Sequence, residues 1–140
     1  MQELKISCFG EVLWDMFPTH KKIGGAPLNV ALRLKSFKNN VSIISKVGND
    51  NLGDSLLEYI SKNGLSTKNI QVDPKLGTGV VKVTLDSEGS ASYEITSSRA
   101  WDNIENKGLL KELVTISDAF IYGSLVCRSE ASKNTLLDLL

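Results

Sequence analysis

The chain has 140 residues, enough for about one domain with a hydrophobic core, and its 41% hydrophobic and 23% charged residues are ordinary for a soluble globular protein. Its 16 basic and 16 acidic residues leave a net charge near zero, so charge gives no argument for nucleic acid or an anionic membrane as a partner, and we expect neither. No apolar run is long enough to span a bilayer, and residues 1–5 lack the basic and apolar regions of a signal peptide.

The cysteines and the histidine give no sign of a disulfide or a metal centre. Cys8 and Cys127 both lie in apolar stretches typical of strands, so we expect buried thiols, and a cytoplasmic location is then the default. His20, the only histidine, lies in a polar loop where we expect it to be solvated. The sequence has no CxxC or histidine pair, so we assign no metal-binding residues.

The chain begins with two expected strands, at residues 4–9 and 12–17, and residues 18–22 predict a turn. Asp15 lies inside the second apolar stretch, between Trp14 and Met16, where a carboxylate needs a partner or a role. From the residues alone, Asp15 is either an outward-facing residue of an edge strand or a functional group.

The stretch from Gly24 to Asn29 organises the rest of the chain. Pro27 suits the first turn of a helix, and residues 27–37 have helical apolar spacing. Gly24 and Gly25 allow a ligand to approach the backbone closely, and the first helical turn offers free N–H groups. Asn29 adds a carboxamide one turn into the helix. This arrangement suits an anion or a ligand rich in hydroxyl groups, although a loop that simply closes onto a helix has the same pattern.

The next segments indicate a parallel sheet covered by helices. Residues 41–47 predict a strand, and residues 52–63 predict a helix that begins after a cap at Asp50 or Asn51 and ends at Gly64. Strand and helix alternate up to this point, which favours parallel strands.

The middle of the chain interrupts this alternation. Residues 79–85 and 91–96 predict a hairpin around a turn at 86–89, and such an insertion is often a lid or an oligomer contact.

The last third returns to the helix–strand pattern, with a short helix at 107–113, a strand at 119–122 and Gly123-Ser124 after it. Ser129 is the expected N-cap of a final helix, where four leucines need a surface to cover. Either the sequence is part of a larger domain or another chain supplies that surface.

Several segments together resemble a known family. They are Gly10-Glu11, Asp15, the Gly-Gly-Ala-Pro-x-Asn form at residues 24–29, the segment at residues 46–50, and Gly53. In order and spacing they resemble the amino-terminal half of PfkB (ribokinase-like) carbohydrate kinases, and are most similar to the fructokinase branch. Residues 64–67 and the hairpin at 78–94 also resemble family segments. The likeness runs from about residue 6 to residue 124.

The resemblance implies a doubly wound α/β fold with helices on both faces of a ribokinase-like sheet and a small β lid. Residues 1–140 would be the amino-terminal part of a single kinase domain, with lid segments near 12–23 and 77–98 and the carboxy-terminal half absent. The family transfers the γ-phosphate of ATP, with Mg²⁺, to a sugar hydroxyl. We therefore expect a cytoplasmic carbohydrate kinase, acting on fructose, that forms a homodimer through the lid.

The resemblance also assigns substrate-binding residues. Asp15 would accept hydrogen bonds from sugar hydroxyls, Gly24 and Gly25 would lie against the sugar, and Asn29 would bind further hydroxyls. Weaker candidates are Ala26, Pro27, Arg99 and Gly123. The sequence departs from the family at the end of the lid hairpin, where Arg99 is displaced from the usual aromatic–arginine pair and Trp101-Asp102 replaces a small residue and an acid.

The family's catalytic residues have no counterpart here. The Gly-Ala-Gly-Asp segment with the catalytic base, and the Asn-x-x-Glu motif linked to Mg²⁺, do not occur in the sequence. We therefore expect the base in the missing half, place no catalytic residue in this chain and expect the 140 residues alone to be inactive.

Three other readings stay open. The protein could be a PfkB kinase of other specificity, for 2-keto-3-deoxygluconate, ribose or a nucleoside, or a non-catalytic sugar-binding or dimerisation module. A dinucleotide-binding domain is disfavoured, because the link from Gly10 to Pro27 is much longer than the tight glycine-rich turn of that fold.

Overall fold

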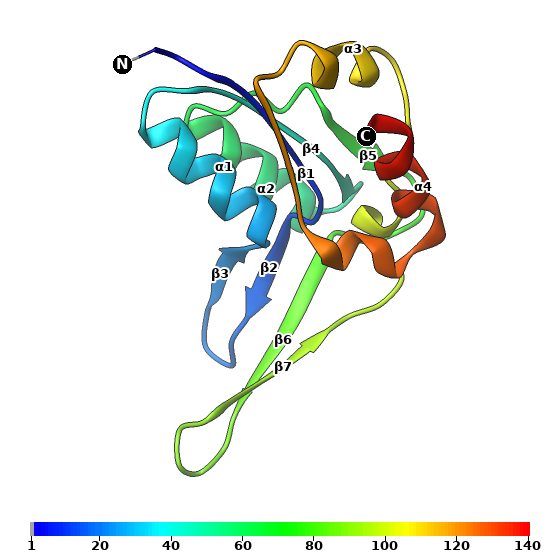
Figure 1. The fold of residues 1–140 in the computed structure, drawn as a ribbon. Helices are drawn as coiled ribbons and strands as arrows, with labels where there is room; N and C mark the ends of the chain where they lie inside the picture. The colour runs from blue at the N-terminus through cyan, green and yellow to red at the C-terminus, as the bar shows by residue number, and fades with distance from the viewer. Residues whose placement is uncertain (1) are drawn as a thin grey trace.

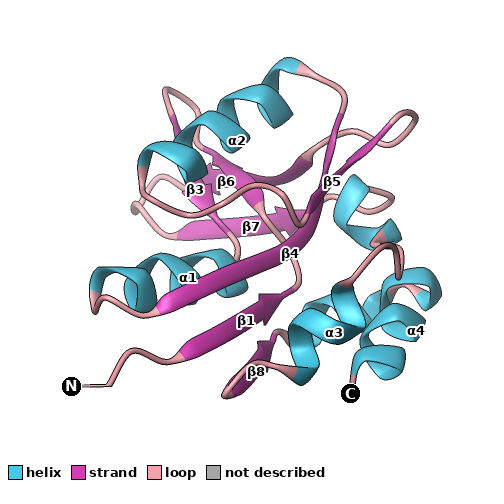
Figure 2. Ribbon diagram, turned by 90° about the horizontal axis from the view of Figure 1, so that it is seen from above, coloured by secondary structure: helices cyan, strands magenta, loops and turns pink. Residues whose placement is uncertain are grey.

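The computed structural model describes residues 2–140 and contains two four-stranded sheets (Figure 1). The first, which we call the parallel sheet, has the strand order β5-β4-β1-β8. Its strands are β1 (Lys5–Phe9), β4 (Asn40–Gly48), β5 (Ile70–Asp73) and β8 (Ala119–Tyr122). Helices cover both of its faces (Figure 2), with α1 (Ala26–Ser36) and α2 (Asn51–Lys62) on one side and α3 (Leu110–Thr115) and α4 (Glu130–Leu139) on the other.

Side-chain alternation along the central strands explains the two helical layers. Cys8 and Ile43 point into the core formed with α1 and α2, whereas Phe9 and Ile44, one residue further on, pack into the core formed with α3 and α4. Successive residues of a strand face opposite sides of the sheet, so both faces of β1 and β4 are apolar. The expected doubly wound α/β class is confirmed.

The second sheet has the order β3-β2-β6-β7 and extends away from the helical layers (Figure 1). It contains β2 (Leu13–Met16), β3 (Lys21–Gly24), β6 (Gly79–Leu85) and β7 (Ala91–Ile95). Strand β2 lies inside this sheet, antiparallel to β3 and parallel to β6. The reading of Asp15 as a residue of an edge strand is therefore wrong.

Helix α2 has the ends that the sequence predicts. Asp50 is the N-cap and accepts a hydrogen bond from the Gly53 N–H at 2.8 Å, and Gly64 follows the helix with a φ of 82°. The short helix α3 begins at Leu110 instead of near residue 107, because Gly108 adopts a φ of 60° that breaks the helical path.

Two strands were not expected. Residues 18–22 were predicted as a turn, but Lys21 and Lys22 belong to β3, which forms by pairing with β2. Strand β5 was not predicted either. Its residues alternate between apolar and polar from Ile70 to Asp73, but over only four positions, and Val72 is exposed while Asp73 is buried. Both strands arise from pairing partners that local composition does not reveal.

The two cysteines differ. Cys8 is fully buried, and desolvation raises the pKa of its thiol to about 11. The expectation for Cys127 is wrong, since this residue is exposed in the short 3-10 helix η2 (Ser124–Arg128). His20 is exposed, as expected, and its ring stacks on Phe17 with 4.6 Å between the centroids.

Helix α4 buries part of its leucine-rich surface. Leu136 and Leu139 are each 2% exposed and pack against the parallel sheet, whereas Leu137 and Leu140 are exposed. Ser129 is at the N-cap, but its hydroxyl makes no capping hydrogen bond and donates to the Asp102 carbonyl instead. None of the helices within residues 2–140 is long and apolar enough to cross a membrane.

A buried lysine ties the carboxyl end of the parallel sheet to the segment that follows the second sheet. Lys46, at the end of β4, is 2% exposed. Its Nζ lies 3.2 Å from an Asp73 carboxylate oxygen and 2.8 Å from Glu105, and it donates to the Asn103 carbonyl at 3.0 Å. An ammonium group buried this deeply requires such partners.

Acid is expected to destabilise the fold through Asp73. Desolvation raises the pKa of this carboxyl, but hydrogen bonds from the Leu76 and Lys75 amides, Asn103 and Lys46 outweigh it and hold the pKa well below the ordinary value. Below about pH 4 the unfolded chain binds a proton here that the folded chain does not, so the stabilisation present at neutral pH is lost as pH falls.

The test compares the free energy of unfolding in urea at pH 7, 5 and 3 for the wild type and Asp73→Asn. The variant is expected to be less stable at pH 7 and to lose less stability on acidification. Asp138→Asn, at an exposed position of α4, is the control. Parallel losses in the wild type and Asp73→Asn would show that Asp73 has no such role.

Candidate functional site

Gly25, which leads into α1, lies directly on the backbone that links β1 to β2. Gly25 has a φ of 102°, and a Cβ at this position would lie 2.4 Å from the Glu11 carbonyl oxygen. Any other residue would be strained by the positive φ and would also overlap the backbone. Glycine at position 25 is therefore a requirement of this junction.

The Asp15 carboxylate lies against Gly24. In the second sheet, Leu13 of β2 is opposite Gly24 of β3, and a Cβ on Gly24 would lie 2.6 Å from Asp15 Oδ2. Within residues 2–140 this carboxylate makes no hydrogen bond or ion pair, and partial burial raises its pKa. An unpartnered acceptor thus lies beside a backbone without a side chain.

The amino terminus of α1 follows immediately. Helix α1 has no side-chain cap, and its first residues, Ala26 and Pro27, are exposed and buried, respectively. Asn29 is exposed one turn into the helix, and its backbone N–H donates to the Gly25 carbonyl at 3.0 Å. Pro27 has no N–H and the Ala26 N–H faces the Glu11 carboxylate, so the exposed Asn29 carboxamide is the clearest group of this turn for binding a hydroxyl.

Pro27 and Gly123 belong to the packing beneath the loop. The Cγ of Pro27 would lie 3.3 Å from a Cβ on Gly123 and 2.7 Å from one on Gly10. The ends of β1 and β8 and the start of α1 therefore meet at close range. These contacts give both residues a structural reason to be there.

Arg99 lies at the base of the second sheet, with Gly77 and Asp50. Its Nη1 would be 2.8 Å from a Cβ on Gly77, its Nε is buried without a hydrogen-bond partner among the described residues, and its charge contributes to the low pKa of Asp50. Desolvation of Asp50 is outweighed by hydrogen bonds from Thr78 and Gly53. Arg99 thus faces the cap of α2.

Glu11 is a buried acid to which the sequence analysis gave no role. Its side chain is 4% exposed, and its Oε2 has no hydrogen-bond partner among residues 2–140 and would lie 3.3 Å from a Cβ on Gly123. Desolvation raises its pKa, which the amides of Glu11 and Ala26 and the charge of Arg128 oppose. An acid directly after an apolar strand, at the edge where ligands bind in α/β folds, is the signal that could have identified it.

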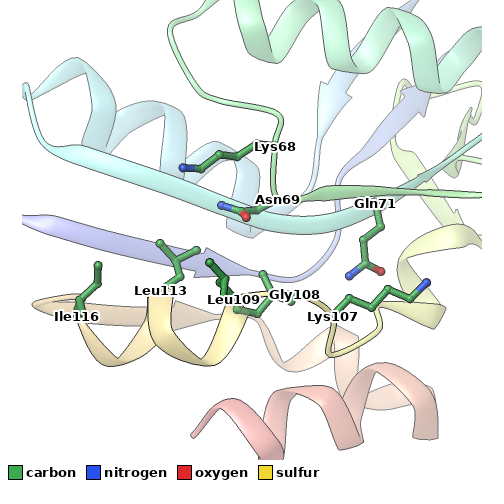
Figure 3. Close-up of a pocket in the computed structure, with 9 residues that line it drawn as sticks. Lys68, Asn69, Gln71, Lys107, Gly108, Leu109, Leu113 and Ile116 are labelled. Carbon is green, nitrogen blue, oxygen red and sulfur yellow. The ribbon is translucent and has the colours of Figure 1, made fainter.

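A separate cavity of about 550 Å³ lies between α3 and the segment around β5 (Figure 3). Lys68, Gln71, Leu113 and Ile116 are among its lining residues, and none of the candidate site residues borders it. No group of three or more His, Cys, Asp or Glu side chains within residues 2–140 could hold a metal ion.

Comparison with known proteins identifies the family. The model of the pfkB family carbohydrate kinases matches residues 2–133. The chain belongs to this family. A protein of Arabidopsis thaliana named as a probable chloroplastic fructokinase is 30% identical over 142 residues, which cover 92% of this chain and 37% of that protein.

Solved structures of pfkB relatives agree with the fold. An uncharacterized sugar kinase from Pyrococcus horikoshii is 30% identical, with a TM-score of 0.84 over 96% of this chain and 50% of that one. The fructokinase of Halothermothrix orenii has a TM-score of 0.84 at 22% identity, covering 97% of this chain and 52% of that one, which supports the fold alone. The chain thus spans about half the length of these relatives and corresponds to their amino-terminal half, and the family resemblance seen in the sequence is confirmed.

The close contact at Gly25 can be tested by substitution, with Gly89, a second glycine of positive φ, as the control. Gly25→Ala and Gly89→Ala should each cost about 1–2 kcal/mol from the left-handed backbone. Only at Gly25 would the new Cβ meet backbone, since Gly89, with a φ of 82°, has nothing within 4 Å. We expect Gly25→Ala to lower the free energy of unfolding by about 1–3 kcal/mol more than Gly89→Ala does. Equal losses in urea unfolding would contradict the close approach.

Proposed function

We propose that the chain is the sugar-binding part of a pfkB carbohydrate kinase whose acceptor is fructose. The observation that carries the proposal is the unpartnered Asp15 carboxylate beside Gly24, next to the uncapped start of α1. Relatives named as fructokinases support fructose as the sugar, and the family supports phosphoryl transfer as the reaction.

The proposed binding mode uses each group for what it can donate or accept. The Asp15 carboxylate accepts hydrogen bonds from two sugar hydroxyls. Gly24 and Gly25 leave space for the sugar ring on the backbone, and the Asn29 carboxamide donates to one hydroxyl and accepts from another. A hydroxyl-rich ligand satisfies an unpartnered carboxylate without requiring a cation.

The phosphate donor is proposed to be ATP, with which the P. horikoshii sugar kinase was solved in complex. Mg²⁺ is proposed as its metal from the family resemblance alone. The described residues do not fit the metal, since no acidic cluster among them could hold it. They also lack the Gly-Ala-Gly-Asp segment. We therefore assign the sugar to this chain and neither the base nor the anion hole, and we expect no turnover by residues 1–140.

The second sheet is proposed to act as a lid over the sugar and as the homodimer contact. Asp15 lies on this sheet, and every residue of β7 is exposed, with Tyr93 at 63%. An exposed edge strand with apolar side chains is a surface that a second copy can cover. Two free cysteines fit the proposed cytoplasmic location.

The first experiment is calorimetric titration of the 140-residue chain with fructose, ribose, 2-keto-3-deoxygluconate and adenosine, followed by an ADP-release assay with ATP and Mg²⁺. We expect fructose to bind most tightly and ADP release to stay at background. Preference for another ligand would overturn the fructose assignment, and steady ADP release would overturn the assignment of the base to residues outside this chain.

Asp15→Asn tests the carboxylate directly. Loss of hydrogen bonds to a charged acceptor should weaken fructose binding by about 10- to 100-fold, while the shape of the side chain is kept. Asp138→Asn, at an exposed position of α4, should leave the affinity unchanged. Equal affinity of the wild type and Asp15→Asn for fructose would remove Asp15 from the site.

A further inference from the structure

The residue that precedes the hairpin of β6 and β7 is fixed by several hydrogen bonds. Thr78, just before β6, donates its N–H and its hydroxyl to the two carboxylate oxygens of Asp50, at 2.9 and 2.7 Å. Its hydroxyl also accepts the Gly48 N–H at 2.9 Å. The start of the hairpin is therefore fixed to the end of β4 and the cap of α2.

The return strand has no comparable packing of its own. All five residues of β7 are exposed, and the strand pairs only with β6 within the described chain. Exposed strands of this kind open at low free energy unless another contact holds them. The contact that holds the end of β7 comes from Arg128, in η2.

Arg128 joins the end of the hairpin to the segment that follows it. Its Nη2 donates to the Thr96 carbonyl at 2.8 Å, and Nε and Nη2 bind the two carboxylate oxygens of Asp102, each at 2.8 Å. The guanidinium also stacks on the fully buried Trp101, 4.0 Å from the ring centroid. A planar fork that binds a carboxylate at two points and stacks on an aromatic ring is geometry that lysine cannot reproduce.

Asp102 is itself held on both sides. Its Oδ2 accepts the Arg99 N–H at 2.9 Å, and its carbonyl accepts the Ser129 hydroxyl. Asp102 is 7% exposed and lies in the 3-10 helix η1 (Ala100–Asn103), which the buried Trp101 anchors. Arg128 therefore binds the hairpin to a rigid support.

The contact between Arg128 and Thr96 is linked to the candidate site through the hydrogen-bonded strands of the second sheet. The Thr96 N–H donates to the Val80 carbonyl at 3.2 Å, and the next residue, Val81, is opposite Asp15 in the parallel pairing of β6 and β2. A shift at the end of β7 thus passes through β6 to the strand that carries Asp15.

We propose that Arg128 is a positioning residue that fixes the return strand of the second sheet and, through β6, the position of Asp15 beside Gly24. It acts through Thr96 and Asp102. The consequence for sugar binding rests on the proposed function, whereas the consequence for the hairpin does not.

The test uses matched arginine-to-lysine replacements. Arg33, on α1, lies 4.7 Å from the ring of the exposed Phe37, so Arg33→Lys also removes a guanidinium stacked on an aromatic ring, but far from the hairpin in sequence. Amide hydrogen exchange is followed by mass spectrometry in β6, β7, β1 and β4. In Arg128→Lys we expect about tenfold faster exchange in β6 and β7, from the loss of charge-assisted hydrogen bonds, with β1 and β4 unchanged. Arg33→Lys should resemble the wild type.

Unchanged exchange in β7 would overturn the proposal. An equal increase in all four strands would also overturn it, because it would report a general loss of stability. If Arg128→Lys does not fold, Asp102→Asn takes its place, and the same selective increase in β6 and β7 is expected. Fructose titration separates the two proposals. If Arg128→Lys shows faster exchange and weaker fructose binding than the wild type, both proposals are supported. If the wild type itself does not bind fructose, faster exchange supports only the role of Arg128 in the hairpin. Faster exchange with unchanged fructose affinity removes the link to Asp15.

Discussion

The close contact between Gly25 and the Glu11 carbonyl is the constraint on which the candidate site depends. It brings the start of α1 onto the backbone that links β1 to β2, so that Gly24, at the end of β3, lies beside the Asp15 carboxylate of β2. A side chain at position 25 would push the start of α1 away from that backbone and so away from the Asp15 carboxylate. This single contact between two backbone segments therefore positions both the glycine backbone and the Asp15 carboxylate of the candidate site.

The hairpin of β6 and β7 is held at its base by polar contacts as well as by the apolar packing of Val81 and Val83. Asp50 and Thr78 hold the entry of the hairpin, and Arg128 holds its exit, whereas β7 is exposed along its whole length. These contacts fix the direction in which the hairpin leaves the fold, while β7, unlike β6, contributes no buried residue to the apolar cores. The proposed role of the second sheet as a lid depends on this combination of a defined base and an exposed return strand.

Sequence patterns predicted the elements in which local signals agree. Helix α2 has an apolar face, a capping Asp50 and a terminal Gly64, and all three signals appear where the structure has them. Strands β3 and β5 could not be predicted in this way, because their pairing comes from other parts of the chain. Arg128 was missed for the same reason: its partner Thr96 is 32 residues away, and nothing around either residue in the sequence links them. Asp15, by contrast, was singled out as a candidate because an acid within an apolar strand conflicts with its surroundings.

The unequal burial of the two cysteines has a practical consequence for studying the base of the hairpin. With its pKa near 11, the Cys8 thiol carries almost no thiolate at neutral pH, and it is fully buried. Cys127 is exposed and is the direct neighbour of Arg128. Because thiolate reacts and thiol does not, an alkylating fluorophore should label the chain selectively at Cys127 without any cysteine replacement. The chain thus carries its own attachment point for a reporter beside the contact that holds the hairpin.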